Sequence, residues 1–438
     1  MLGLNFASKK SLNLGCRSWE ADLTPTACRK FLKALTVVGS FAGVLLALSP
    51  LARAMDSTEV LPEAINSPSV RIGFVSGIGF RFLSSGDLMS LNDINSIEFD
   101  AKALSAFEPR VNELVGVLNQ FGNQRLGDQL SLGTLKLDTD PKIKYYAPVF
   151  AHGINARWTV AVGLPVVSYT NKISMTQSRG NVEEIRAQIG NASPEINAAF
   201  NDLSVNLATV ANQTLEAKGY QPITDREETH LGDLNVASLI EFAKRDNASG
   251  QYKLILTLPT GKGNDPDDLA DIGAFGYTAI ENQLTANYLM GRLQMAGKAG
   301  YRYTLPDRVV RRVPVNESDT LPGIETKQTV ERSTGGALFG GGSLTYRFSD
   351  AFNVGLGLER TLKDGDRYSG SSTGRYDLLG KDTDSQTDRL RVGLNYSTIE
   401  SFLAGTSLLP SMIAYEFSDT IRGVNTERMT VHEIWLQL

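Results

Sequence analysis

The segment from residue 231 to residue 263 shows the pattern that most limits how this chain can fold. Apolar and polar residues alternate along two runs, 234–242 and 252–258, and residues 246–250 (DNASG) join them. A period of two places successive side chains on opposite faces of a strand, and Asn and Gly supply the positive φ of a tight turn. The segment therefore predicts a β-hairpin with one apolar face and one more polar face.

The same two-faced pattern recurs along the chain and predicts about twelve strands. We expect them near residues 69–84, 133–149, 158–165, 234–242, 252–258, 280–288, 295–303, 338–348, 352–358, 389–396, 411–417 and 429–438. One set of connections is mostly short: 151–156, 245–250, 289–293, 349–351 and the longer 398–408. The other set is long: 85–128, 171–231, 261–276, 305–336, 364–387 and 418–427. An even number of strands with this asymmetry is typical of outer-membrane barrels, whose short turns face the periplasm.

The N-terminal region carries the pattern of an export signal. Three basic residues, Arg29, Lys30 and Lys33, precede an apolar run at 34–48, and an Ala-x-Ala site ends at Ala54. The apolar run is about 15 residues long, whereas a spanning helix needs about 20. We therefore expect residues 1–54 to be a leader and signal peptide that is cut after Ala54. An uncleaved membrane anchor is the alternative.

Composition narrows the class of protein further. Hydrophobic residues make up 42% of the chain, which is too few for a helical membrane protein. Both cysteines, Cys16 and Cys28, precede the expected cut, so we expect no disulfide and no thiolate metal site in residues 55–438. The net charge of −5 argues against nucleic acid as a partner.

A soluble β-sandwich would also show alternating strands. Several strands exceed ten residues, however, and aromatic residues gather near strand ends, as they do in membrane barrels. These aromatic residues are Tyr145, Tyr146, Trp158, Tyr169, Tyr301, Tyr303, Phe348, Phe352 and Trp435. The sequence therefore predicts an all-β transmembrane antiparallel barrel of about 12 strands over residues 55–438, in the outer membrane of a Gram-negative cell.

Two of the long connections carry a helical period instead. Apolar residues recur every three or four positions in insertions near 100–121 and 180–219. They are Leu104, Phe107, Val111, Leu114, Leu118 and Phe121, followed by Ile196, Phe200, Leu203, Leu207 and Val210. Ser193 is the expected N-cap of the second helix, with Pro194 at its first position. These helices in two outer loops would pack on their own protein or bind a surface partner, and would project outward or plug the lumen.

Charged residues on the polar face of the strands should line a water-filled lumen. The expected lumen residues are Arg71, Arg81, Lys136, Lys298, Arg302, Arg347, Glu359, Arg389 and Arg391. Lys136 belongs to the charged face of the long strand at 133–149, which we expect to face the interior. Such a mixed lining fits a structural ion-pair network, a weakly selective pore or a path for anionic solutes.

The chain shows little sign of catalytic chemistry. Its three histidines, His152, His230 and His432, have no metal-ligand spacing, and no Ser/His pairing is visible locally. Residues 259–263 (PTGKG) lack the spacing of a phosphate loop. The aspartates at 265–271 would suit Ca²⁺ but equally form a solvated loop. We expect no enzyme activity and no cofactor.

Three stretches resemble outer-membrane proteins associated with meta-pathway phenol degradation. They are residues 153–167 (GINARWTVAVGLPVV), 232–263 and 421–431 (IRGVNTERMTV), within a similarity over about 145–438. The resemblance implies a channel for passive uptake of small hydrophobic or aromatic molecules, with outer-membrane lipid and such solutes as its partners. No site residue is carried over, because these motifs are strand and turn signals. The alternative is a surface-interaction protein whose closed barrel anchors outer helical loops.

Overall fold

The computed structural model describes most of the chain after the expected signal peptide. The described residues are 55–94, 96–101, 110–120, 125–189, 196–197, 200, 207–271, 276–319 and 321–438. The expected leader at 1–54 lies outside them, as do Leu104, Phe107, Phe121, Ser193, Pro194 and Leu203 of the predicted helices.

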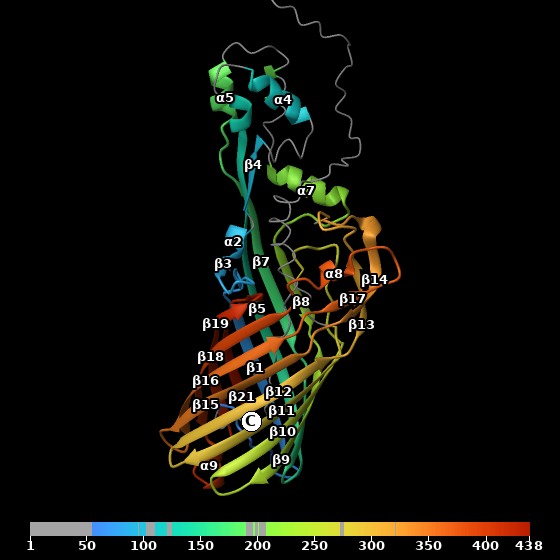
Figure 1. Cartoon of the computed structure of the whole chain (residues 1–438). Helices are drawn as coiled ribbons and strands as arrows, with labels where there is room; N and C mark the ends of the chain where they lie inside the picture. The colour runs from blue at the N-terminus through green and yellow to red at the C-terminus, as the bar shows by residue number, and fades with distance from the viewer. Residues whose placement is uncertain are drawn as a thin grey trace, which may run out of the picture.

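A closed antiparallel barrel of 12 strands forms the body of the molecule (Figure 1). Its strands are β1 (Asn66–Ser76), β5 (Ser131–Asn155), β6 (Trp158–Gly163), β9 (Leu234–Lys244), β10 (Ala248–Leu258), β11 (Ala279–Met290), β12 (Leu293–Thr304), β15 (Ala337–Arg347), β16 (Phe352–Lys363), β18 (Ser385–Ser397), β19 (Met412–Val424) and β21 (Thr430–Gln437). The barrel closes because β1 pairs with β21 on one side and with β5 on the other. The fold class predicted from the alternation is confirmed.

The two faces of the barrel differ as the period-two pattern requires. Leu284, Leu344 and Leu356 point outward and are about half exposed, at 55%, 50% and 52%. Their inward neighbours Gln283, Ser343 and Thr345 are buried. An apolar outer face around a polar interior is the arrangement that a barrel adopts in lipid.

The strands are joined by tight turns at one end of the barrel and by long segments at the other. The β11–β12 turn, for example, spans only Gly291 and Arg292, and Gly291 takes a φ of 60° there. A cluster of aromatic side chains lies at this end: Phe348 packs on Tyr346 and Phe352, with ring centroids 4.9 and 5.7 Å apart. By the usual orientation of such barrels, this end faces the periplasm.

At the opposite end, part of the sheet continues beyond the barrel. There β5 pairs with β4 (Ser96–Asp100) and β7 (Val166–Gln177), and β7 pairs with β8 (Arg226–Leu231). Smaller sheets combine β2 (Phe80–Phe82), β3 (Leu88–Ser90) and β20 (Thr426–Glu427), and β13 (Asp307–Arg312), β14 (Lys327–Ser333) and β17 (Arg367–Ser369).

Short helices accompany this outer part of the molecule. They are α2 (Leu91–Ile94), α4 (Arg110–Leu118), α5 (Val182–Ile189), α7 (Leu207–Ala217) and α8 (Tyr376–Leu379), with 3-10 turns η2 (Leu126–Gln129) and η3 (Ile324–Thr326). The helix α9 (Ile399–Leu403) lies instead in the β18–β19 connection at the short-turn end. No helix in the described part of the chain is both long and apolar enough to cross a membrane.

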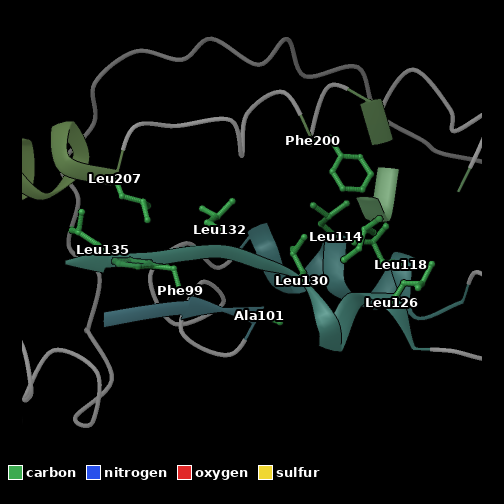
Figure 2. Packing of buried hydrophobic residues seen from close by; sticks show 11 residues of the cluster. Phe99, Ala101, Leu114, Leu118, Leu126, Leu130, Leu132, Leu135, Phe200 and Leu207 are labelled. Carbon is green, nitrogen blue, oxygen red and sulfur yellow. The ribbon is translucent and has the colours of Figure 1, made fainter. Parts of the chain in front are cut away.

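Both helical insertions contribute to one apolar core above the barrel. Leu114 and Leu118 of α4 lie near Phe200, while Leu207 reaches toward Leu135 of β5 (Figure 2). Leu118 and Phe200 are completely buried. The helices α4, α5 and α7 lie beyond the outer end of the barrel (Figure 1), whereas Ile399 of α9 packs against the buried cluster of the opposite end that includes Leu61 and Leu239. Their buried apolar faces pack on their own protein.

Two strand predictions need correction. The first strand was expected to continue to Ser84, but β1 ends at Ser76, because Gly77 turns the chain with a φ of 80°. The charged face of β5 also points outward rather than inward. Leu135 and Leu137 are buried at 1% above the barrel, and Tyr145 and Val149 are buried within it, whereas Lys136 and Lys144 lie on the outward face. Apolar clusters cover the inner side of β5 both above the barrel and inside it, so the charged face turns outward.

Candidate functional site: the barrel lumen

A large cavity of ≈ 1630 Å³ occupies the barrel and extends to the outer loops. Its wall includes Arg71, Lys253 and Glu359 from barrel strands, and Asp265 and Lys381 from outer loops. Rings also contribute to the wall, from Tyr145, Tyr277, Phe339 and Trp435. The lumen is thus polar and aromatic at once.

Most charges on the wall are held in ion pairs between strands. Arg71 of β1 lies 3.5 Å from Glu433 of β21 and stacks over the Trp435 ring, 4.2 Å from its centroid. Tyr145 of β5 donates a hydrogen bond to the same Glu433. On the opposite wall, Arg302 of β12 lies 3.0 Å from Glu281 of β11. Alternation brings these residues together because each occupies an inward position.

A second network lies beside the first, on β12, β16, β18 and β19, where Glu416 is the register partner of Glu433. Arg391 makes a two-pronged contact with Glu416, at 2.8 and 3.0 Å. Lys298 pairs with Glu359, and Glu359 also lies 3.8 Å from Arg391. Asp56, which precedes the first strand, bridges Lys298 at 3.1 Å and Arg391 at 2.9 Å. Its side chain is only 7% exposed.

The segment that carries Asp56 crosses the lumen. Ser343 of β15 donates to the Met55 carbonyl (3.4 Å), and Leu61 donates its N–H to Thr159 Oγ1 of β6 (2.7 Å). Between them, Gln251 of β10 donates to the Glu59 carbonyl at 3.2 Å. Sequence reasoning missed this segment. The available signal was a set of inward-facing glycines on β16 and β18, where a strand ordinarily prefers larger side chains.

Most of the predicted lumen residues lie on the wall of the cavity. Those that lie on the cavity wall are Arg71, Arg81, Lys298, Arg302, Glu359, Arg389 and Arg391. Arg81 does so from β2, in a buried pair with Glu427 at 3.0 Å. Arg347 lies nearer the short turns, where it donates to Gln294. The placement of Lys136 was wrong, because it sits on the outward face of β5 and pairs with Asp138.

The outer mouth is held together by one buried arginine. Arg312 of β13 donates to the carbonyls of Lys218 and Pro322 and lies 3.7 Å from the centroid of the Tyr220 ring. It also pairs with Asp267 at 2.8 Å. Burial alone would raise the pKa of Asp267, but hydrogen bonds from Lys327 and Arg312 lower it below its ordinary 3.8. Three outer loops therefore meet at Arg312.

In the part of the chain that the structure describes, no group of three His, Cys, Asp or Glu side chains is placed to hold a metal ion. His152 bonds with Asn66 and His432 with Tyr415, each at 2.8 Å. These histidines take part in contacts between strands.

A closed antiparallel barrel with an apolar outer face and a charged interior defines a transmembrane β-barrel of the outer-membrane type. No protein-family model and no curated protein sequence matches this chain.

Several solved structures are similar to the fold. One is the COG4313 outer-membrane channel from Pseudomonas putida F1, at 12% identity over 87% of this chain and 97% of that one, with a TM-score of 0.48. The toluene transporter TbuX of Ralstonia pickettii matches at 7% identity over 86% and 90%, with a TM-score of 0.32. A Pseudomonas aeruginosa FadL homologue matches at 8% identity over 85% and 90%, with a TM-score of 0.33. With TM-scores this low, none of them defines the substrate of this chain.

Proposed function

We propose that this protein is an outer-membrane channel through which small hydrophobic or aromatic molecules enter passively. The observation that carries the proposal is the cavity of ≈ 1630 Å³ inside a closed barrel, which reaches from the outer loops deep into the lumen. A barrel that served only as an anchor would need no such space. Solutes would meet the wall residues Arg71, Lys298, Arg302, Glu359, Arg389 and Arg391 on their way.

The chemistry of the wall suits solutes that combine a ring with a polar group. Arg71 is neutralised by Glu433, and Arg302 by Glu281, so these pairs offer hydrogen bonds with little net charge. The rings of Tyr145, Phe339 and Trp435 supply faces for stacking. The sequence resemblance to proteins of phenol degradation suggests the same class of solute.

The surface-interaction alternative has weaker support. It needs helical faces that are free to bind, but Leu114, Leu118 and Phe200 are buried in the protein's own core. An enzyme would need a nucleophile beside a base, or a metal, on the cavity wall. The described wall offers paired charges and aromatic rings.

Single-channel recording in a planar lipid bilayer tests the channel. We expect the purified, folded protein to produce discrete current steps, and phenol to interrupt the current as it passes through the lumen. The variant Trp435→Ala, on the cavity wall, should weaken this interruption. The matched control Trp158→Ala, whose ring is 38% exposed on the outer face, should not. A folded barrel that produces no current steps in the wild type or in any variant, with or without solute, would contradict the proposal.

A further inference from the structure

The segment Met55–Leu61 closes the periplasmic end of the cavity. Met55, Asp56 and Ser57 form part of its wall. Inward-facing residues nearer the short turns, such as Thr345, Gln294 and Gln437, are buried and lie outside that wall. The segment enters from this end, where Ala64 and Ile65 exchange backbone hydrogen bonds with Gly153 at 2.8 and 2.9 Å. The cavity therefore ends at Met55–Ser57, and the rest of the segment fills the barrel between these residues and the short turns.

The barrel wall is shaped to receive the start of this segment. A Cβ added to Gly355, Gly357 or Gly393 would lie 3.2, 2.8 or 2.9 Å from atoms of Met55. All three glycines face the lumen on neighbouring strands, where larger side chains would push Met55 away. Glycine is the residue that permits such a close approach. Met55 is 8% exposed in this position.

The charges around Asp56 leave a place for one anion. Lys298, Arg389 and Arg391 supply three positive charges, while Glu359 and Glu416 supply two negative ones. Arg389 Nε has no hydrogen-bond partner among the described residues. The Asp56 carboxylate supplies the missing negative charge by bridging Lys298 and Arg391.

The surplus of positive charge around Asp56 indicates that this site binds anions. Resting on the proposed channel function, we propose that Lys298 and Arg391 form an anion-binding site, which Asp56 of the chain's own N-terminal segment occupies in the closed channel. A small aromatic carboxylate that enters from the cavity takes the place of the Asp56 carboxylate. The segment then leaves the lumen, and the passage to the periplasm opens.

The first experiment locks the segment in place. Thr58 Oγ1 and Ser249 Oγ lie 2.5 Å apart, so cysteines at both positions would be close enough for a disulfide. No cysteine follows Cys28 in the sequence, so no native thiol in residues 55–438 competes. We expect Thr58→Cys/Ser249→Cys to lose its current steps when oxidised and to regain them when reduced. The single variant Thr58→Cys should produce the same current steps under oxidising and reducing conditions. If the oxidised double variant conducts like the reduced one, the segment Met55–Leu61 is not the gate that closes the channel.

The second experiment removes the tethered anion. Asp56→Asn keeps a residue that tolerates the left-handed backbone of this position (φ 54°) but removes its charge. We expect the open fraction to rise about tenfold or more, because the contacts to Lys298 and Arg391 both lose the carboxylate charge. Asp382→Asn is the matched control, because Asp382 also has a left-handed backbone (φ 59°) and also lines the cavity, at its outer end. This control should behave like the wild type.

The third experiment identifies the ligand class with two probes that both carry a benzene ring but differ in charge. Benzoate should raise the open fraction of the wild type and leave Asp56→Asn unchanged, whereas benzyl alcohol, which lacks the charge, should open neither. Equal opening by both probes overturns the anion site. Wild-type and Asp56→Asn barrels that conduct equally overturn the gate but leave the channel intact. A folded barrel that conducts in no variant overturns the channel and the gate together.

Discussion

At the scale of single residues, the barrel interior is organised by charges that neutralise each other across strands. The pair of Arg81 and Glu427, which lies on the cavity wall in the small sheet of β2 and β20, is the most enclosed example, with side chains only 9% and 5% exposed. Both carry charge where water is scarce, so each depends on the other. Removing one partner leaves the other charge buried without a counter-ion. The resulting loss of stability is usually larger than the stability that the intact pair contributes.

The variant Arg81→Ala should therefore lower the free energy of unfolding by about 3–5 kcal/mol. Its matched control is Arg308→Ala, because Arg308 pairs with Glu331 in solvent, with side chains 76% and 64% exposed. That control should change stability by no more than about 1 kcal/mol. Urea unfolding of both variants in detergent micelles measures the difference. Equal losses would mean that the Arg81 pair is hydrated in solution.

At this scale the sequence predicts which side chains share a face of a strand, but not in every strand which of the two faces points inward. Arg71, Lys298 and Arg391 reach the cavity wall because the polar face of their strands is the inner one. Lys136 does not, because apolar clusters cover the inner side of β5 and its charged face points outward. Asp56 was missed because it precedes any periodic segment, and its contacts are all distant in sequence.

At the scale of elements, the strands were predictable and the outer loops were not. Alternation within strands such as β10, and the short turns between strands, are local signals that survive in any context. The small sheet of β13, β14 and β17 pairs segments from two different loops. The core shared by α4 and α5 likewise joins two insertions far apart in the chain. No local pattern encodes such pairings.

The outer loops should loosen in acid because Asp267 joins them to Arg312. The pKa of Asp267 is below its ordinary 3.8 in the folded protein, since Lys327 and Arg312 stabilise the carboxylate. A lowered pKa contributes stability above pH 3.8, and this contribution is lost as the pH falls through the lowered value. The protection factors of β13 and β14, which relate the observed exchange rates to the slower intrinsic exchange in acid, should thus decrease below pH 3.8. In Asp267→Asn that acid-dependent step should be absent, and its persistence would assign the step to another carboxyl group.

At the scale of the whole molecule, one condition underlies both fold and function: the sheet must close on itself with lipid outside and water inside. The pairing of β1 with both β5 and β21 meets that condition and leaves no free edge in the barrel. The same alternation that presents leucines to lipid places ion pairs around the cavity. Membrane insertion and a polar passage therefore follow from one pattern.

Substitutions at two adjacent positions test this condition directly. Leu284 lies midway along β11 and points outward, at 55% exposure, whereas its neighbour Gln283 lines the cavity. Arginine in the lipid-facing centre of a barrel strand costs about 2–4 kcal/mol, so Leu284→Arg should fold less in lipid vesicles. Gln283→Arg should fold normally and shift the ion selectivity toward anions. Folding yield by heat-modifiable gel mobility and reversal potential by bilayer recording give the two readouts. If Leu284→Arg folded as well as Gln283→Arg, water rather than lipid would surround this face, and the barrel would not span a membrane.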